Sequence, residues 1–281
     1  MSKRLYKYLR QEAFPTPFCS GCGHGILMGA ILRAIDELNL DFEMRGDPSS
    51  PRSLRKNPSG DSKGLCPFDK MVFVSGIGCG AWIPSPHFAA DTLHTLHGRA
   101  IAYATGVKLV NPELKVVVIS GDGDIAAIGG NHLIHAARRN ITLTVICANN
   151  SIYGMTGGQV SPTTPQFAKT STTVQGNPEP PFDLCQLVLA CGATYVARYT
   201  PYHIRPLINS IKKALLTNGF SFIDVISPCP TQFGRRNQMA SLYDMLMFLK
   251  ANSINYAQAK NLTKEELKNK IVIGEFTNAS D

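Results

Sequence analysis

Apolar, β-branched residues gather in five short runs along the chain. Between these runs, apolar positions recur every three or four residues, which is the spacing of amphipathic helices. The runs predict strands at residues 71–75, 115–120, 141–148, 194–197 and 220–226. The periodic segments predict helices at residues 25–38, 95–110, 125–139, 182–190 and 204–216. Strands that alternate with helices predict an α/β fold, a doubly wound and mostly parallel sheet with helices on both faces.

This fold class also predicts where a ligand binds. In doubly wound sheets, ligands bind outside the carboxyl ends of the strands. The loops that follow Ser75, Ser120, Ala148 and Ile226 should therefore share one rim of the sheet. Most of the polar and sulfur-bearing motifs of the chain lie in these loops.

Three segments interrupt the alternating pattern. Residues 41–67 are rich in Pro, Gly, Ser, Arg and Lys and have no periodicity, so we expect a basic loop insertion. Residues 151–181 form a long polar loop, and loops of that length are usually functional or disordered. From residue 232 to 281 we expect a C-terminal extension, with helices at 240–249 and 264–270, the second begun by a Thr263–Glu266 capping box. Together with an N-terminal extension, these segments belong to a single domain, residues 1–281.

Composition and charge narrow the classes of protein. The chain has 281 residues, 44% of them hydrophobic, enough for one large α/β domain. Its net charge of +8 favours anionic partners, but no nucleic-acid-binding motif has the expected spacing. No apolar run approaches the roughly 18–20 residues that span a bilayer, and no signal-peptide core follows the basic N-terminus. We expect a soluble, cytoplasmic protein that binds neither nucleic acid nor membrane.

The first candidate site combines two motifs on neighbouring strand ends. Gly121-Asp122-Gly123-Asp124 follows one predicted strand, and Asn149-Asn150 ends the next. Glycines let backbone N–H groups approach a diphosphate closely, and the following helix N-terminus favours its negative charge. The carboxylate of Asp122 and the amide oxygen of Asn150 are hard ligands suited to Mg²⁺. The motifs predict a magnesium–diphosphate site, and the alternative is an ordinary strand–helix turn.

Cysteines form the second candidate site. Without an export signal, the eight thiols should be buried or metal-bound rather than paired in disulfides. Three lie in apolar runs and are expected in the core: Cys147, Cys185 and Cys191. Four others combine a C-x-x-C pair with two cysteines that follow predicted strands: Cys19, Cys22, Cys79 and Cys229. Four thiolates can hold zinc or an iron–sulfur cluster, and on this chemistry alone both remain open.

The order of these motifs resembles a known family. From Cys19-Ser20-Gly21-Cys22-Gly23-His24-Gly25 to Gln232-Phe233-Gly234-Arg235-Arg236-Asn237, the chain is similar to the β subunits of 2-oxoacid:ferredoxin oxidoreductases, which bind thiamine diphosphate. The resemblance implies that Mg²⁺ is bound by Asp122, Asn150 and the backbone carbonyl of Ile152. It implies that Cys19, Cys22, Cys79 and Cys229 bind one [4Fe–4S] cluster. Cys66 lies in the insertion and departs from the family pattern, so we expect a surface thiol, with a substitute cluster ligand as the alternative.

The resemblance also implies a cofactor pocket. Thiamine diphosphate would contact Ile77, Gly78, Cys79, Gly80, His97, Gly121, Gly123, Asp124, Gly154 and Met155. The candidate catalytic residues are His97, as a hydrogen-bond donor to phosphate, and Arg99, as a clamp for phosphate or carboxylate. An ordinary salt bridge is the alternative for Arg99. Trp82 is expected either to wall the pocket or to fill the core.

The activity that the resemblance implies is oxidative decarboxylation of a 2-oxoacid. Coenzyme A takes the acyl group and electrons pass through the cluster to ferredoxin, with the reverse direction, CO₂ fixation, also open. The loop from Tyr153 to Pro165 resembles that of subunits for 2-oxoglutarate and also that of subunits for branched-chain 2-oxoacids. The Gln232–Asn237 motif and the tail at residues 271–276 look most like the 2-oxoglutarate type, with branched-chain 2-oxoacids or pyruvate as alternatives. Some relatives have a lysine at the position of Gly157, where it can meet a substrate carboxylate, and Gly157 removes that charge here.

A partner subunit is also implied. In this family, the glutamate that thiamine chemistry requires comes from the pyrimidine-binding domain of an α subunit, so we expect a heteromer. Two rival interpretations remain. A non-redox thiamine enzyme subunit would leave the four cysteines unexplained, and a zinc-stabilised binding protein would use them only structurally.

Overall fold

A mostly parallel sheet of eight strands forms the centre of the molecule. The computed structural model describes residues 3–38, 68, 70–239 and 241–276. The strands follow the order β2-β1-β3-β4-β6-β5-β8-β7, and β8 runs antiparallel to β5 while the other pairs are parallel. Their bounds are β1 (Met71–Ser75), β2 (Asp91–His94), β3 (Lys115–Gly121), β4 (Thr144–Asn149), β5 (Tyr195–Tyr199), β6 (Ser221–Ile226), β7 (Ser253–Asn255) and β8 (Ile271–Phe276).

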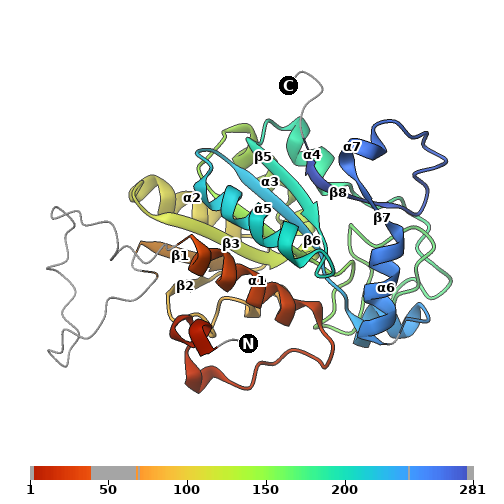
Figure 1. Cartoon of the computed structure of the whole chain (residues 1–281), viewed down its shortest axis with the longest axis horizontal. Helices are drawn as coiled ribbons and strands as arrows, with labels where there is room; N and C mark the ends of the chain where they lie inside the picture. Colours follow the sequence, from red (N-terminus) through yellow and green to blue (C-terminus); the bar gives the residue numbers. More distant parts are fainter. Residues whose placement is uncertain (1–2, 39–67, 69, 240, 277–281) are drawn as a thin grey trace, which may run out of the picture.

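Helices cover both faces of this sheet (Figure 1). The helices α1 (Gly23–Glu37) and α5 (Ile204–Leu216) pack on one face, and α2 (Ala100–Val110), α3 (Gly130–Arg138) and α4 (Leu184–Ala190) pack on the other. Side chains of a strand alternate between the two faces, so each strand contributes to two cores. In β3, for example, Val117 and Ile119 join the first core, and Val116 and Val118 join the second. The predicted doubly wound α/β fold is confirmed.

The differences from the predicted elements have local causes. The helix expected from residue 95 begins at Ala100, because residues 95–99 turn around Gly98, whose φ of +71° lies in the left-handed region. The helix expected over 125–139 is a π-helix at Gly123–Ile128 followed by α3. Residues 264–269 form turns instead of the expected helix, although the Thr263 N–H does donate to Glu266 Oε2 over 2.8 Å. One capping box cannot outweigh the cost of nucleating so short and exposed a helix.

The extensions lie around this central unit. Two 3₁₀-helices, η1 (Lys3–Tyr8) and η2 (Gln11–Ala13), precede α1, while α6 (Leu242–Asn252) and α7 (Tyr256–Ala259) follow β6. Between β4 and α4 the chain forms turns and loop, as the polar composition predicts. The whole of the predicted insertion at 41–67, and Cys66 with it, lies outside the described residues. Across the part of the chain that is described, no helix has both the length and the hydropathy to cross a membrane.

Candidate active site

A cavity of about 190 Å³ opens at the carboxyl ends of β1, β3 and β4. All ten residues that the sequence predicts for cofactor binding line it: Ile77, Gly78, Cys79, Gly80, His97, Gly121, Gly123, Asp124, Gly154 and Met155. The three residues predicted to bind Mg²⁺ line it too: Asp122, Asn150 and Ile152. Residues from three distant parts of the chain therefore meet where a parallel sheet places its strand ends.

Glycines let the walls of this cavity approach one another. Gly78 has a φ of +117°, a conformation that other residues rarely adopt. A Cβ atom at Gly123 would overlap the ring of Tyr153, whose hydroxyl donates a hydrogen bond to the Gly123 carbonyl over 3.1 Å. The Gly-Asp-Gly turn is therefore held directly against the start of the long polar loop.

Three oxygen-bearing groups converge at one point beside this turn. The tip of the Asn150 side chain lies 2.7 Å from the Ile152 carbonyl oxygen and 3.2 Å from Asp122 Oδ1. When its amide nitrogen faces them, Asn150 donates a hydrogen bond to both. When its oxygen faces them, three oxygens point at one another, an arrangement that a cation satisfies. Carboxylate, amide and carbonyl oxygens are the donor set that Mg²⁺ prefers, so the residues fit a divalent cation.

The other oxygen of Asp122 is held by hydroxyl groups. Ser161 Oγ and Thr163 Oγ1 donate to Asp122 Oδ2 over 2.6 and 2.7 Å. Asp122 is 1% exposed, and burial raises the pKa of its carboxyl above the usual value, although these hydrogen bonds act in the opposite direction. A cation on Oδ1 would offset that cost of burial.

Asp124 has a different set of contacts, although it lies only two residues further on. Its Oδ1 accepts hydrogen bonds from His97 Nδ1 over 2.6 Å, from the Gly98 N–H over 2.7 Å and from the Ile77 N–H over 3.1 Å. Its Oδ2 accepts from Ser120 Oγ over 2.8 Å. The carboxylate thus joins three loops, so a diphosphate would meet the backbone of this turn rather than the Asp124 side chain. His97 is oriented by this bond and keeps Nε2 for a ligand.

The other candidate catalytic residue, Arg99, does not line the cavity. Its guanidinium donates to the carbonyl oxygens of Gly98 and Ile128 over 3.3 and 3.4 Å. These bonds tie the start of α2 to the π-helix. Trp82 also stays outside the cavity and is 37% exposed, so it neither walls the pocket nor fills the core.

The four predicted cluster cysteines lie near one another. A methyl group at Gly154 would lie 3.5 Å from Cys79 Sγ and 3.9 Å from Cys229 Sγ. The pKa of Cys22 is raised to about 12, mainly by burial and also by the nearby thiols of Cys229, Cys79 and Cys19, against a backbone hydrogen bond that lowers it. Burial, together with Cys229 and Cys19, raises the pKa of Cys79 to about 11. Within the described residues, no group of three or more His, Cys, Asp or Glu side chains is arranged to hold a single metal ion.

The remaining cysteines of the described chain behave as core residues. Cys147 and Cys185 are buried, and Cys191 is partly buried and packs against the core that contains α2, α3 and α4. These thiols are therefore in the environment that their apolar neighbours in the sequence predict.

Sequence reasoning missed several residues of the site. His24, Tyr153 and Thr156 line the cavity, and Ser161 and Thr163 support it from behind. His24 is fully buried, and its Nδ1 lies 2.8 Å from Ser227 Oγ. The position of His24 within the Cys22-Gly23-His24-Gly25 motif could have identified it as a site residue. The polar loop gave none, because its hydroxyl side chains follow no period.

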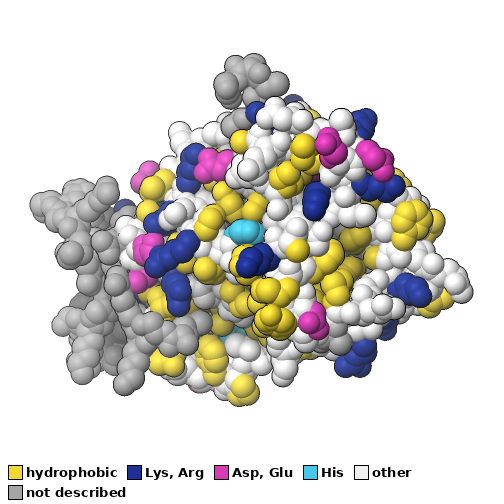
Figure 2. Space-filling view, turned by 45° about the vertical axis from the view of Figure 1, so that its right-hand side comes forward, with side chains coloured by type: hydrophobic (Ala, Val, Ile, Leu, Met, Phe, Trp, Pro, Cys, Tyr) yellow, Lys and Arg dark blue, Asp and Glu magenta, His cyan; other side chains and the backbone are white. Residues whose placement is uncertain are grey.

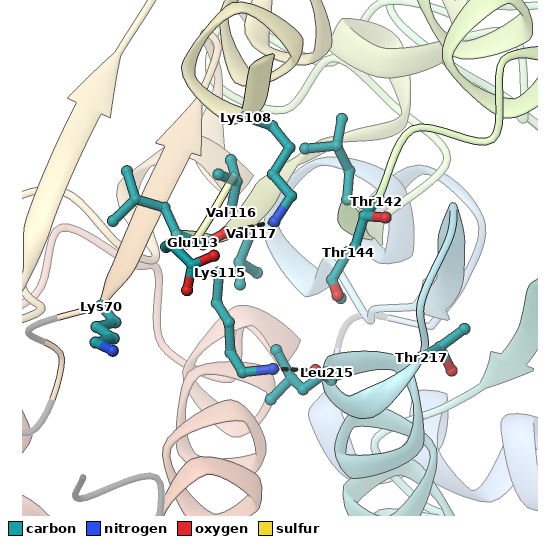
Figure 3. Close-up of a pocket in the computed structure, with 12 residues that line it drawn as sticks. Lys70, Lys108, Glu113, Lys115, Val116, Val117, Thr142, Thr144, Leu215 and Thr217 are labelled. Carbon is teal, nitrogen blue, oxygen red and sulfur yellow. Dashed lines mark hydrogen bonds between the residues drawn. The ribbon is translucent and has the colours of Figure 1, made fainter. Parts of the chain in front are cut away.

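A second cavity, of about 230 Å³, lies at the other end of the strands, where β1, β3 and β4 begin (Figure 3). None of the predicted site residues lines it. Lys108 Nζ donates to the Pro112 and Leu114 carbonyl oxygens over 2.6 and 2.8 Å, and Lys115 Nζ donates to the Leu215 carbonyl oxygen over 2.9 Å. Unpaired carbonyls gather where helices end, and α2 and α5 end here. Lys115 therefore stabilises the end of α5, and Lys108 ties the last turn of α2 to the turn that follows that helix.

The comparisons with known proteins agree with this site. Residues 76–225 match the family model of the C-terminal TPP-binding domain of thiamine pyrophosphate enzymes. The fold and the site thus define a thiamine-pyrophosphate-binding protein.

More specific relatives narrow the class. The chain is 50% identical over 273 residues to 2-oxoglutarate synthase subunit KorB of Methanothermobacter marburgensis, covering 97% of this chain and 86% of that protein. It is 50% identical over 270 residues to the KorB subunit of Methanocaldococcus jannaschii, covering 96% and 90%. The solved 2-oxoglutarate:ferredoxin oxidoreductase of Magnetococcus marinus, with 2-oxoglutarate, coenzyme A and succinyl-CoA bound, superimposes with a TM-score of 0.76 at 30% identity, covering 96% of this chain and 83% of that one. The chain belongs to the 2-oxoacid:ferredoxin oxidoreductase β-subunit family, as its motifs indicated.

Proposed function

We propose that this chain is the β subunit of a 2-oxoglutarate:ferredoxin oxidoreductase. The reaction releases CO₂ from 2-oxoglutarate, joins the succinyl group to the sulfur of coenzyme A and passes the electron pair through a [4Fe–4S] cluster to ferredoxin. One observation carries the proposal: the cavity with the converging oxygens of Asp122, Asn150 and Ile152 also includes Cys79, a member of the thiol set. The KorB relatives and the Magnetococcus enzyme support 2-oxoglutarate as substrate.

The chain's own residues would hold the cofactor in defined ways. Asp122, Asn150 and the Ile152 carbonyl would bind Mg²⁺, and the backbone N–H groups from Gly121 to Asp124 would face the diphosphate. Thiamine diphosphate, when bound, supplies the electron-accepting chemistry that decarboxylation requires. His97, oriented through Nδ1 by Asp124, would contact the bound cofactor with Nε2.

The thiol set would hold the cluster beside this cavity. Cys79 lines the cavity and lies next to Cys229 across Gly154, so one turn belongs to both sites. Electrons that leave the substrate would therefore travel a short path before they reach the cluster. Because the thiols of Cys22 and Cys79 have raised pKa values, cluster binding would release their protons.

An α subunit would complete the site. None of the described residues that line the cavity is a glutamate, although thiamine chemistry in this family requires one. Helix α2 carries an outward apolar face, in which Tyr103, Leu109 and Val110 are 46%, 66% and 88% exposed. Exposed apolar faces of this kind mark protein interfaces. Elsewhere, as Figure 2 shows on one side of the molecule, hydrophobic side chains lie interspersed with polar and charged ones. We assign the α2 face to the α subunit that carries the pyrimidine-binding domain.

Anaerobic purification together with the partner subunit tests this proposal. Iron and acid-labile sulfide at about four each per chain, with ferredoxin reduction that requires both coenzyme A and 2-oxoglutarate, is the expected result. Zinc without sulfide would favour the binding-protein interpretation. Thiamine diphosphate without iron would favour a non-redox thiamine enzyme. A higher rate with pyruvate or a branched-chain 2-oxoacid would keep the family but change the substrate.

A further inference from the structure

We propose that Ser161 and Thr163 are positioning residues for the divalent-cation site. They act on the Asp122 carboxylate and are themselves fixed by a buried chain of hydrogen bonds that runs to Arg198. This inference rests on the proposed function, since it concerns the cation that would bind with thiamine diphosphate. It gives a role to the part of the long polar loop that follows the cavity-lining residues Ile152, Gly154 and Met155.

The two hydroxyls hold one oxygen of Asp122 and leave the other toward the cavity. Ser161 Oγ and Thr163 Oγ1 lie 2.6 and 2.7 Å from Asp122 Oδ2, and both side chains are buried. Asp122 Oδ1 lies on the side of Asn150 and Ile152, where the oxygens converge. The carboxylate therefore cannot rotate without breaking two buried hydrogen bonds.

Thr163 is fixed in turn by Asn149. Thr163 Oγ1 lies 2.9 Å from Asn149 Oδ1, so its single proton faces two acceptors. Asn149 Nδ2 donates to Asp224 Oδ1 over 3.0 Å, which determines that the amide oxygen of Asn149 points toward Thr163. The two asparagines at the end of β4 thus have different contacts. Asn150 faces the cation site, and Asn149 holds the loop that supports Asp122.

A buried ion pair ends the chain of hydrogen bonds. Arg198 Nε donates to Asp224 Oδ2 over 2.8 Å, and Arg198 Nη2 donates to Asp183 Oδ1 over 2.6 Å. Asp224 and Arg198 are 1% and 8% exposed, and they lie on the neighbouring strands β6 and β5. A carboxylate held by a buried guanidinium across two strands is a rigid anchor for Asn149.

Rigidity has a direct consequence for a magnesium site. Mg²⁺ requires a nearly ideal octahedron of oxygens, so a carboxylate that is already oriented loses less entropy on binding. Hydrogen bonds to ligating side chains commonly change metal affinity by about 10–100-fold when they are removed. The hydroxyls of Ser161 and Thr163 are in the position to exert that effect.

The test is cation binding by the full chain assembled with its partner subunit. Mn²⁺ serves as the probe at saturating thiamine diphosphate, and free Mn²⁺ is measured by EPR, so enzymatic turnover plays no part. The variants are Thr163→Val, which removes the hydroxyl at constant shape, and Thr163→Ser, which keeps it. Thr170→Val is the matched control, because Thr170 is 1% exposed in the same loop and, among the described residues, its hydroxyl bonds only to Thr172 and Thr173.

Thr163→Val should raise the Mn²⁺ Kd at least tenfold, in line with a range of about 10–100-fold for such contacts, while Thr163→Ser and Thr170→Val should stay close to the parent. If Thr163→Val does not fold, Ser161→Ala replaces it with the same expected direction. A Kd in Thr163→Val equal to that of the parent would overturn the inference. So would an equal loss of affinity in Thr170→Val, which would indicate general damage to the loop. A parent complex that binds thiamine diphosphate but no Mn²⁺ would overturn the cation site itself, and thereby the proposed function.

Discussion

At the scale of single residues, two aspartates of one motif have opposite surroundings. Asp122 Oδ1 faces the cavity and accepts only the Asn150 backbone N–H, over 3.2 Å, among the described residues, whereas Asp124 Oδ1 accepts three hydrogen bonds from surrounding loops. In the Gly121-Asp122-Gly123-Asp124 motif, the two aspartates differ only in their position along the chain. The difference arises because Ser120, His97 and the turn at Gly98 all reach Asp124, and these contacts depend on loops that lie far apart in the sequence.

Replacing Asp122 separates the cation site from the cluster. Asp122→Ala should abolish binding of Mg²⁺ and thiamine diphosphate, because it removes the one charged ligand, and it should leave the iron content unchanged. Calorimetric titration of the complex with thiamine diphosphate and an iron assay on the same sample measure both properties. Cofactor affinity equal to that of the parent would rule out Asp122 as the cation ligand.

Replacing Cys79 tests the thiol set. Cys79→Ala should lose the cluster, since three thiolates remain for a site that uses four. Cys191→Ala is the control, because Cys191 is only partly buried, packs against apolar side chains and lies in no thiol group. Iron and sulfide per chain after anaerobic purification distinguish the two variants. Full iron in Cys79→Ala would remove Cys79 from the ligand set.

At the scale of elements, burial on both faces decided what could be predicted. The sequence predicts all five strands of the centre of the sheet: β1, β3, β4, β5 and β6. Their cores are apolar because both of their faces are covered, and the charged residues of β5 and β6, Arg198 and Asp224, are buried as an ion pair. The strand β2 was missed because it is a short edge strand with exposed ends. The strands β7 and β8 were not predicted. They pair with each other in the C-terminal extension, where the sequence shows no alternation of apolar and polar residues. The sequence predicted the site residues that lie at strand ends. It did not predict Ser161 and Thr163, because their loop is ordered by tertiary contacts that leave no pattern in the sequence.

The start of α4 offers a prediction about pH. Asp183 accepts hydrogen bonds from the Cys185 and Gln186 N–H groups and pairs with Arg198. Burial alone would raise the pKa of Asp183, but the charge and hydrogen bond of Arg198, together with the hydrogen bonds from the Cys185 and Gln186 N–H groups, outweigh it and hold that pKa below the usual 3.8. A carboxyl with a lowered pKa in the folded state stabilises the fold above pH 3.8 and loses that contribution as the pH falls through its folded value.

Asp183→Asn should retain the helix cap and lose only the charge. Because the side chain is 47% exposed, we expect a loss of about 1 kcal/mol in the free energy of unfolding at pH 7. The difference between parent and variant should stay constant from pH 5 to 8, a window about one to four units above that pKa, and shrink below pH 4. Denaturant unfolding across that range measures it. A difference that grows on acidification would contradict the assigned role of the Arg198 pair.

At the scale of the whole molecule, the cavity lies at the carboxyl ends of the strands. The helix layer of α2, α3 and α4 on one face of the sheet leaves an apolar surface of α2 exposed. Only Ala100, Ile101 and Ala104 of α2 are buried, although the helix is largely apolar. The exposed Tyr103, Leu109 and Val110 recur at the spacing of a single helix face. A helix that is apolar on both its inner and outer faces is expected where a second protein packs. None of the described residues that line the cavity is a glutamate, so the proposed α subunit would supply one.

A charge on this face should therefore weaken assembly with the α subunit. Leu109→Lys would bury an unpaired ammonium in an apolar interface, which costs several kcal/mol and corresponds to a loss of affinity of about 100-fold or more. Leu216→Lys is the matched control, because Leu216 is 62% exposed at the end of α5, on the opposite face of the sheet. Quantitative co-purification of the two subunits over a concentration series measures the affinity. If Leu109→Lys assembles like the parent, or if both variants weaken assembly equally, the α2 face does not bind the α subunit, and the missing glutamate must approach the cavity over another surface.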